Sequence, residues 1–130
     1  MRKIETRRTH SVLFEVLWLL ALAATSTGEL LPANGTPMRW IAATHINDKT
    51  LHFGAYALLA FIPVFGFRRR SGIPLALSMI PLGIAIEYGQ SLIPSRSFEL
   101  ADMVANALGV SAGIVVALVA GQAWMPVVEP

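Results

Sequence analysis

Residues 73–93 read IPLALSMIPLGIAIEYGQSLI, an apolar run of transmembrane length that nevertheless contains Glu87 and Gln90 near its end. Crossing the hydrocarbon core of a bilayer takes about 20 mostly apolar residues in a helix. A charged side chain at the centre of such a helix costs about 2.5 to 3.5 kcal/mol on insertion scales, and less towards an end. We therefore interpret this segment as a membrane span that carries part of a polar site.

The rest of the chain has the same character. Of its 130 residues, 55% are hydrophobic and only 14% are charged, whereas soluble domains have about 25% charged residues. The mean hydropathy is +0.60. The sequence predicts an all-α integral membrane protein, a four-helix bundle that forms a single domain over residues 1–130. The predicted spans are roughly 12–31, 49–67, 73–93 and 100–121.

The distribution of basic residues predicts the orientation of this bundle. Four of them precede the first span and three fill the link between the second and third spans. By the positive-inside rule, both termini face the cytoplasm (N-in/C-in) and the loops 32–48 and 94–99 lie outside. Topology also explains the arginine link more simply than nucleic-acid binding does, so we expect no nucleic-acid partner. The residues are Arg2, Lys3, Arg7 and Arg8, then Arg68, Arg69 and Arg70.

The N-terminal segment also resembles a secretory signal, because a basic stretch precedes the apolar run 16–24 and the small residues 21–24. Cleavage there would leave three spans. We favour an uncleaved first helix, because apolar character resumes at Leu30 and Leu31 before Pro32. The sequence contains no cysteine, which excludes a disulfide framework and a thiolate metal site.

Polar residues occur at similar depths in three of the predicted spans. Glu87 lies about 9 Å from the outer end of the third span, and His52 lies about 6 Å into the second. Asp102 and Asn106 lie about 4 and 10 Å beyond Glu99 in the fourth. Since neighbouring spans pack side by side, we expect these side chains to meet in an outward-facing cleft formed by the second, third and fourth spans.

Two interpretations of this cluster remain open. It is either a buried hydrogen-bonded network that fixes helix register or a site in which His52, Glu87 and Asp102, the catalytic candidates, manage protons. Arg96, directly above, either pairs with Glu87, Glu99 or Asp102 or holds an anionic group of a ligand. The predicted ligand-binding residues are Lys49, His52, Glu87, Gln90, Arg96, Asp102 and Asn106.

A metal site built from His52, Glu87 and Asp102 is chemically conceivable, because imidazole with two carboxylates suits several divalent ions. The spacing of these residues is not diagnostic of any metal, and we predict neither a metal nor a cofactor. Small residues at steps of four, including Gly109 and Gly113, predict close helix packing along the fourth span. We favour packing within the chain and leave open a homodimer through the same two glycines.

Local signals predict several details of the helices. Pro63 and Pro81 should kink their spans and leave carbonyl groups of the preceding turn to find other donors. Thr36 followed by Pro37 predicts a short surface helix, and the alternative is an irregular loop in which Trp40 is an interfacial anchor. Helix caps are predicted at Asn47 or Asp48 for the second span and at Ser97 for the fourth.

The ordered set of polar residues resembles the VanZ-like family. Its pattern is D-K-x-x-H-F-x-x-Y, then E-x-x-Q, then P-x-R-x-x-x-x-x-D-x-x-x-N-x-x-G, and the resemblance covers Asn47 to Gly113. Glu99 departs mildly from the Asp often seen near the loop Arg. The matching residues are Asp48, Lys49, His52, Phe53, Tyr56, Glu87, Gln90, Pro94, Arg96, Phe98, Asp102, Asn106 and Gly109.

The resemblance implies a small multi-pass protein of the bacterial cytoplasmic (inner) membrane, in a family whose founding member is associated with teicoplanin resistance. No reaction follows from it. We expect an outward-facing polar cleft that binds an anionic cell-envelope ligand, such as a lipid-linked precursor or a phospholipid headgroup, or an antibiotic. The alternative is a membrane-embedded hydrolase or transferase that acts on a lipid-linked headgroup. Proton-coupled transport is disfavoured, since no ionisable residue continues a pathway in the inner half of the spans.

Overall fold

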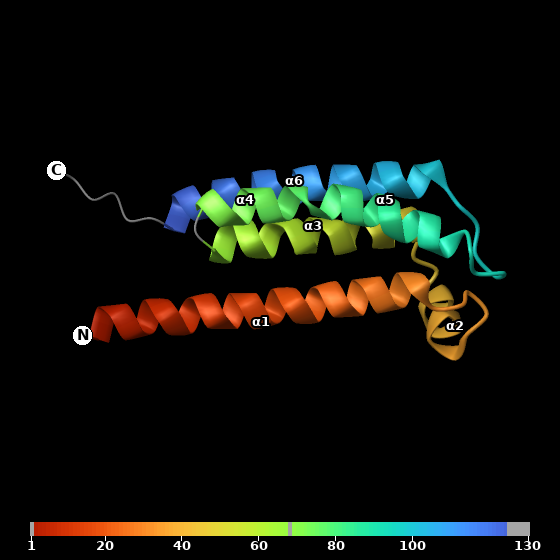
Figure 1. Cartoon of the computed structure of the whole chain (residues 1–130), viewed down its shortest axis with the longest axis horizontal. Coiled ribbons are helices and arrows are strands. Elements are labelled where there is room, and N and C mark those ends of the chain that lie inside the picture. The colour runs from red at the N-terminus through yellow and green to blue at the C-terminus, as the bar shows by residue number, and fades with distance from the viewer. Residues whose placement is uncertain (1, 68, 125–130) are drawn as a thin grey trace.

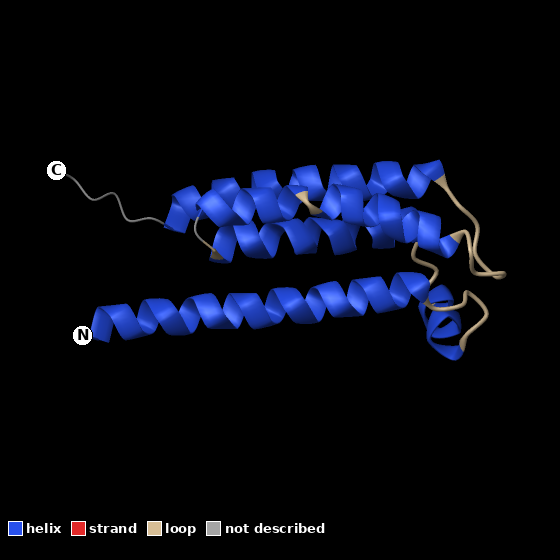
Figure 2. Cartoon of the chain, in the orientation of Figure 1, coloured by secondary structure: helices blue, strands red, loops and turns tan. Residues whose placement is uncertain are grey.

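The computed structural model describes residues 2–67 and 69–124, and within them it is entirely helical, with no strand (Figure 2). Four segments are long and apolar enough to cross a membrane, and their ends agree with the predicted spans to within three residues. The all-α fold is therefore confirmed. The helices are α1 (Arg2–Leu30), α2 (Thr36–Ala43), α3 (Asp48–Gly66), α4 (Arg69–Leu77), α5 (Met79–Gln90) and α6 (Leu100–Trp124). The candidate spans are Val12–Leu30, Asp48–Gly66, Ser71–Gln90 and Leu100–Gln122.

The long helices lie side by side, and the short helix α2 lies beyond one end of α1 (Figure 1). We call this end of the bundle the α2 end; the loop between α5 and α6 is also there. The first helix begins and the last helix ends at the opposite end, together with the link from α3 to α4 (Figure 1). The two basic segments therefore share one end of the molecule, although Arg68 lies outside the described residues. The N-in/C-in orientation itself stays a prediction.

Helices α3 and α6 pack closely against each other, backbone to backbone. A Cβ atom added at Gly109 would overlap the carbonyl oxygen of Phe53, and one added at Gly113 would overlap that of Ala57. Because hydrophobicity does not drive helix association in lipid, such close approach of two backbones is a main source of stability. The ridge of small residues is thus used within the chain. The homodimer through Gly109 and Gly113 that the sequence left open stays a prediction.

The carbonyl that Pro63 was predicted to free has found another donor, while the kink stays a prediction. Because proline has no N–H, the carbonyl of Leu59 one turn earlier receives no helical hydrogen bond from residue 63. The indole nitrogen of Trp18 on α1 donates to this carbonyl at 3.0 Å. The third span is interrupted at Ser78, between α4 and α5 and one turn before Pro81. The hydrogen bond from Trp18 satisfies the carbonyl that proline frees and also holds α1 against α3.

The connections at the α2 end follow the sequence signals only in part. Thr36 does begin a helix, α2, and its Trp40 is 74% exposed. Asn47 caps α3, since its Oδ1 accepts a hydrogen bond of 2.8 Å from the backbone of Lys49. The predicted cap at Ser97 is wrong. Helix α6 begins only at Leu100, because Ser97 turns its hydroxyl to the side chain of Glu99 at 3.3 Å instead.

Candidate functional site

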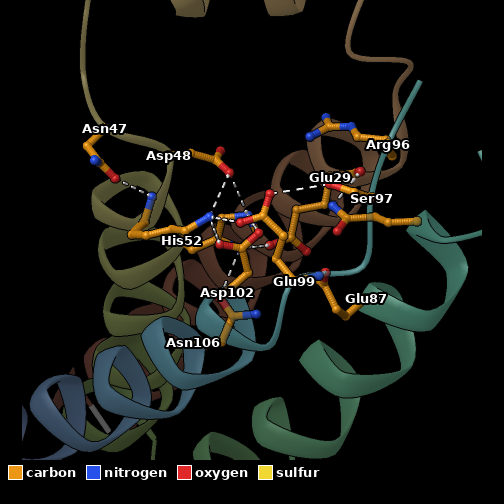
Figure 3. A network of polar contacts seen from close by, with 12 residues as sticks. Glu29, Asn47, Asp48, His52, Glu87, Arg96, Ser97, Glu99, Asp102 and Asn106 are labelled. Atoms are coloured by element: carbon orange, nitrogen blue, oxygen red, sulfur yellow. Dashed lines mark hydrogen bonds and ion pairs between the residues drawn. The ribbon is translucent and has the colours of Figure 1, made fainter.

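Polar side chains from α1, α3, α5 and α6 converge at the α2 end (Figure 3). Five of them are buried, each less than a tenth exposed, in a chain whose outer helix faces carry large exposed apolar side chains. The convergence that the depths predicted for the second, third and fourth spans is therefore present in the structure. The five buried residues are His52, Glu87, Gln90, Asp102 and Asn106.

Lys49, in the first turn of α3, neutralises carboxylates of neighbouring elements. Its Nζ lies 2.7 Å from Asp102 Oδ1 and 3.8 Å from Asp48 Oδ2, and it donates a hydrogen bond to Glu99 Oε2. The hydrogen bond and positive charge of Lys49 lower the pKa of Glu99, so this loop carboxylate is held ionised. Lys49 is thus fully occupied by acidic partners.

His52 lies at the centre of the cluster, one turn into α3. Its Nδ1 is 3.0 Å from Asn106 Oδ1 and 3.2 Å from Glu29 Oε1. Its Nε2 faces two further carboxylates, at 3.6 Å from Asp102 Oδ2 and 3.9 Å from Asp48 Oδ2. The imidazole is therefore held by acceptors on the Nδ1 side, while Nε2 has no partner within hydrogen-bond distance among the described residues.

Glu29, near the end of α1, is the site residue that the sequence analysis missed. Its side chain is only 10% exposed. Besides facing His52, it accepts a hydrogen bond of 3.1 Å from the Tyr56 hydroxyl through Oε2. The available signal was the same one that identified Glu87: an ionisable residue close to the end of an apolar span.

Glu87 and Gln90 of α5 connect the third span to its neighbours. Glu87 Oε1 accepts a hydrogen bond of 2.6 Å from the backbone N–H of Glu99, just before α6. The amide nitrogen of Gln90 donates 2.8 Å to the backbone carbonyl of Glu29. Both side chains are almost completely buried. These contacts agree with the interpretation of the cluster as a buried hydrogen-bonded network that fixes helix register.

Arg96 does not pair with any of the three carboxylates proposed for it. Its Nε donates to the carbonyl of Leu31 at 3.0 Å, and its Nη2 donates to the carbonyl of Gly28 at 3.2 Å. The last carbonyls of a helix lack intrahelical partners and carry partial negative charge, so a guanidinium is a favourable partner for them. Arg96 therefore ties the loop between α5 and α6 to the end of α1. No hydrogen bond of its Nη1 occurs within the described residues.

A cavity of about 500 Å³ lies at the α2 end, between α1, α2 and α3. Its polar lining consists mainly of Glu29, Asp48, His52 and Arg96, while apolar and small side chains form most of its wall. The cleft predicted between the second, third and fourth spans stays a prediction. The polar side chains where α3, α5 and α6 meet are buried, and the cavity described here lies on the α1 side of α3. The wall residues are Ala24, Thr25, Gly28, Ala33, Met38, Ile41, Ala42, Ile46, Leu51 and Ala55.

Of the seven predicted ligand-binding residues, only His52 and Arg96 line the cavity. Asp102 is behind His52 and contacts it, whereas Lys49, Glu87, Gln90 and Asn106 support the arrangement from the sides away from the cavity. The roles of these residues in binding remain predictions. Chemically, the arrangement offers an oriented imidazole, several carboxylates and one guanidinium at the wall of an otherwise apolar cavity.

Comparison with known proteins places this arrangement in a family. The family model described as VanZ/LLP1 matches residues 7–121, which include every residue of the cluster. The chain belongs to the VanZ/LLP1 family. The chain is also 40% identical over 70 residues to an uncharacterised protein of Schizosaccharomyces pombe; the match covers 51% of this chain and 43% of the yeast protein. No solved structure matches the chain significantly.

Membership of the VanZ/LLP1 family and four apolar helices of spanning length agree with a multi-pass membrane protein. The similarity to a yeast protein means that the family match does not by itself indicate a bacterial membrane. The bacterial inner-membrane location therefore stays a prediction.

Proposed function

We propose that this VanZ/LLP1 protein binds the anionic headgroup of a membrane lipid in the cavity at the α2 end. The observation that carries the proposal is the combination, in one cavity, of apolar walls and a polar side formed by His52, Arg96 and two carboxyl groups. Ligand pockets have volumes of about 300 to 1,000 Å³ and few polar groups, and this cavity of about 500 Å³ falls within that range. A cavity with apolar walls and one polar side suits an amphiphilic ligand.

Arg96 is the group best suited to hold an anion. It lines the cavity, and its Nη1 has no hydrogen bond among the described residues while Nε and Nη2 position the guanidinium. A guanidinium held in this way has donors already oriented towards a phosphate or carboxylate. Lys49, the other cation proposed from the sequence, is occupied by Glu99 and Asp102.

A yeast protein is similar to part of this chain, which favours a ligand that bacteria and eukaryotes share. A lipid-linked precursor or a phospholipid meets this requirement better than an antibiotic does. The role in teicoplanin-type resistance that the family resemblance implied is then secondary, an effect on the lipid-linked part of the cell envelope. Expression in a sensitive bacterium would raise the tolerated concentration of teicoplanin, and Glu87→Gln with Asp102→Asn would abolish the effect at equal protein levels.

Lipid binding is tested by filling the cavity without removing a polar group. The full chain is reconstituted in nanodiscs of phosphatidylcholine containing a small fraction of phosphatidic acid, and retained lipid is counted by native mass spectrometry. Ala55 lines the cavity, so Ala55→Leu should reduce retention of phosphatidic acid by about tenfold, equivalent to about 1.4 kcal/mol. The control is Gly54→Leu on the same helix, where an added Cβ atom meets no atom within 4 Å. Equal retention by both variants would overturn the proposal.

Binding of the anionic headgroup is tested by a second pair of variants, one at the cavity and one outside it. Arg96→Gln should abolish the preference for phosphatidic acid over phosphatidylcholine, because the only cavity guanidinium among the described residues is lost. Arg39→Gln on α2 removes the same charge from a residue that does not line the cavity, and should leave the preference unchanged. A loss of preference in both variants would show general surface electrostatics instead of a site.

Hydrolysis of the bound headgroup is a second candidate, favoured by the imidazole of His52 at the cavity wall. General bases work best when a carboxylate or amide orients the ring, as Glu29 and Asn106 do here. In this candidate a water oxygen bonds to phosphorus, the bond from phosphorus to the leaving oxygen breaks, and Nε2 takes the water proton and returns it to that oxygen. Release of inorganic phosphate from phosphatidic acid or a prenyl diphosphate, lost in His52→Gln, would support it. Absence of any release from the wild-type protein would reject it.

A further inference from the structure

The acidic cluster at the α2 end contains more negative charge than its cations neutralise. Glu29, Asp48, Glu99 and Asp102 all lie in contact with Lys49 or His52, and Lys49 is the only Lys or Arg that these carboxylates contact within the described residues. Two of the four side chains, those of Glu29 and Asp102, are at least nine-tenths buried. Buried carboxylates without enough counter-charge are unfavourable and commonly coordinate a metal ion.

The atoms that face each other have the separation of metal ligands. His52 Nε2, Asp48 Oδ2 and Asp102 Oδ2 come from three residues whose ligand atoms all lie within 4.8 Å of one another. The Nε2 to oxygen distances of 3.6 and 3.9 Å are too long for hydrogen bonds. Two ligand atoms that each lie about 2.1 Å from one ion in a tetrahedral site are about 3.4 Å apart. The two Nε2 to oxygen separations are thus slightly above the value for one shared ion, and neither contact is a hydrogen bond.

The other nitrogen of His52 supplies the second, independent observation. The side chain is 94% buried, being only 6% exposed; its Nδ1 lies 3.0 Å from Asn106 Oδ1, in hydrogen-bond contact, and 3.2 Å from Glu29 Oε1. A histidine that binds a metal through one nitrogen usually donates the N–H of the other to a carboxylate or carbonyl, which fixes the tautomer. The buried Nε2 faces one oxygen of each aspartate and makes no hydrogen bond among the described residues. With an ion bound and the proton on Nδ1, Nε2 would direct its lone pair at the ion.

We propose that Asp48, His52 and Asp102 bind one divalent transition-metal ion, with Glu29 and Asn106 as the positioning residues for the imidazole. One nitrogen and two carboxylate oxygens suit Zn²⁺, Mn²⁺, Co²⁺ or Fe²⁺ better than Mg²⁺ or Ca²⁺, which prefer oxygen alone. Lys49 then stays paired with Asp102 Oδ1, the oxygen that does not face His52. Asp48 and His52 line the cavity, so the ion would be reachable from it.

This site does not depend on the proposed lipid. A bound ion would, however, change the charge that the cavity presents to a lipid headgroup. A dication offsets the charge of Glu29 and Asp48, which an anionic headgroup would otherwise face. Because Nε2 would be a ligand, His52 would not be the base of the hydrolytic candidate; a water molecule bound to the ion has a lowered pKa and would take that place.

The test uses the full chain in detergent, purified without a histidine tag, stripped with a chelator and titrated with Co²⁺ alone. Visible absorption and elemental analysis should show one ion bound per chain, and Zn²⁺ should displace it. Asp48→Asn should weaken binding by at least tenfold, since even residues behind the ligands typically contribute 10- to 100-fold. Asp48 is exposed, so this variant should fold, which circular dichroism verifies.

The matched control is Glu99→Gln, which removes one carboxylate from the same cluster, also exposed and also paired with Lys49. It should change Co²⁺ affinity by less than threefold. Glu29→Gln, behind the imidazole, should weaken binding by an intermediate factor. Failure of the wild-type protein to bind Co²⁺, or equal losses in Asp48→Asn and Glu99→Gln, would overturn the proposal, because general attraction of cations to acidic residues would then suffice.

Discussion

Glu29 of α1 accepts a hydrogen bond of 3.1 Å from the hydroxyl of Tyr56 on α3, and its other carboxyl oxygen lies 3.2 Å from His52. Tyr56 is completely buried. One carboxyl group thus links the helix that closes the cavity to the helix that carries the central imidazole. The position of α1, and with it the shape of the cavity, depends on this contact and on the hydrogen bonds of Arg96 to the end of α1.

The Tyr56 hydroxyl should contribute measurably to stability. Tyr56→Phe should lower the free energy of unfolding by about 0.5 to 1.7 kcal/mol, the range measured for single hydrogen bonds between membrane helices. Unfolding in mixed micelles, followed by circular dichroism, measures the change. Tyr88→Phe is the control, because Tyr88 is 61% exposed and its ring packs on Phe98. A loss of equal size at Tyr88 would contradict a specific role for the contact with Glu29.

Trp18 and Pro63 should be energetically coupled through the carbonyl of Leu59. Trp18→Phe removes the donor to this carbonyl and should cost about 0.5 to 1.7 kcal/mol in the wild-type background. Pro63→Ala restores a backbone N–H that can bond to the same carbonyl. In that background the cost of Trp18→Phe should fall, and a double-mutant cycle measures the difference. Additive effects of the two substitutions would show that α1 is held by other contacts.

Close packing of α3 and α6 predicts a clear difference between glycines of one helix. Gly113→Ala should destabilise the protein by about 1 to 3 kcal/mol, the usual cost of overpacking, because the new methyl group meets the backbone of Ala57. Gly121→Ala should be neutral or slightly stabilising, since a Cβ there meets nothing within 4 Å. The same micelle assay separates them. Similar stabilities for both variants would mean that α6 faces α3 differently.

The sequence predicted the parts of this structure that depend on hydrophobic length and on the depth of polar residues. Span ends, the buried positions of His52, Glu87 and Asp102 at one end of the bundle, and the carbonyl left by Pro63 all follow from such local signals. Each is dictated by the cost of placing a polar group in hydrocarbon, which one segment reveals by itself.

The partners of these groups could not be predicted in the same way, because they depend on how the helices are rotated against each other. Arg96 was matched to carboxylates nearby in sequence, yet it reaches the carbonyls of Gly28 and Leu31. The position of α1 against α3 could not be predicted from the sequence either, so the cavity lined by α1 was not expected. Helix packing within a membrane rests on surface shape, which periodicity alone does not encode.

The orientation of the bundle is the remaining prediction, and the absence of cysteine makes it directly testable. Ser95 lies in the loop at the α2 end and Ser71 near the start of α4 at the opposite end. With basic residues on the cytoplasmic side, Ser95→Cys should react with an impermeant maleimide in intact cells, while Ser71→Cys should react only after permeabilisation. Both substitutions are small and lie at exposed positions. Labelling of Ser71→Cys alone in intact cells would reverse the topology and move the cavity, with its acidic cluster, to the cytoplasmic face.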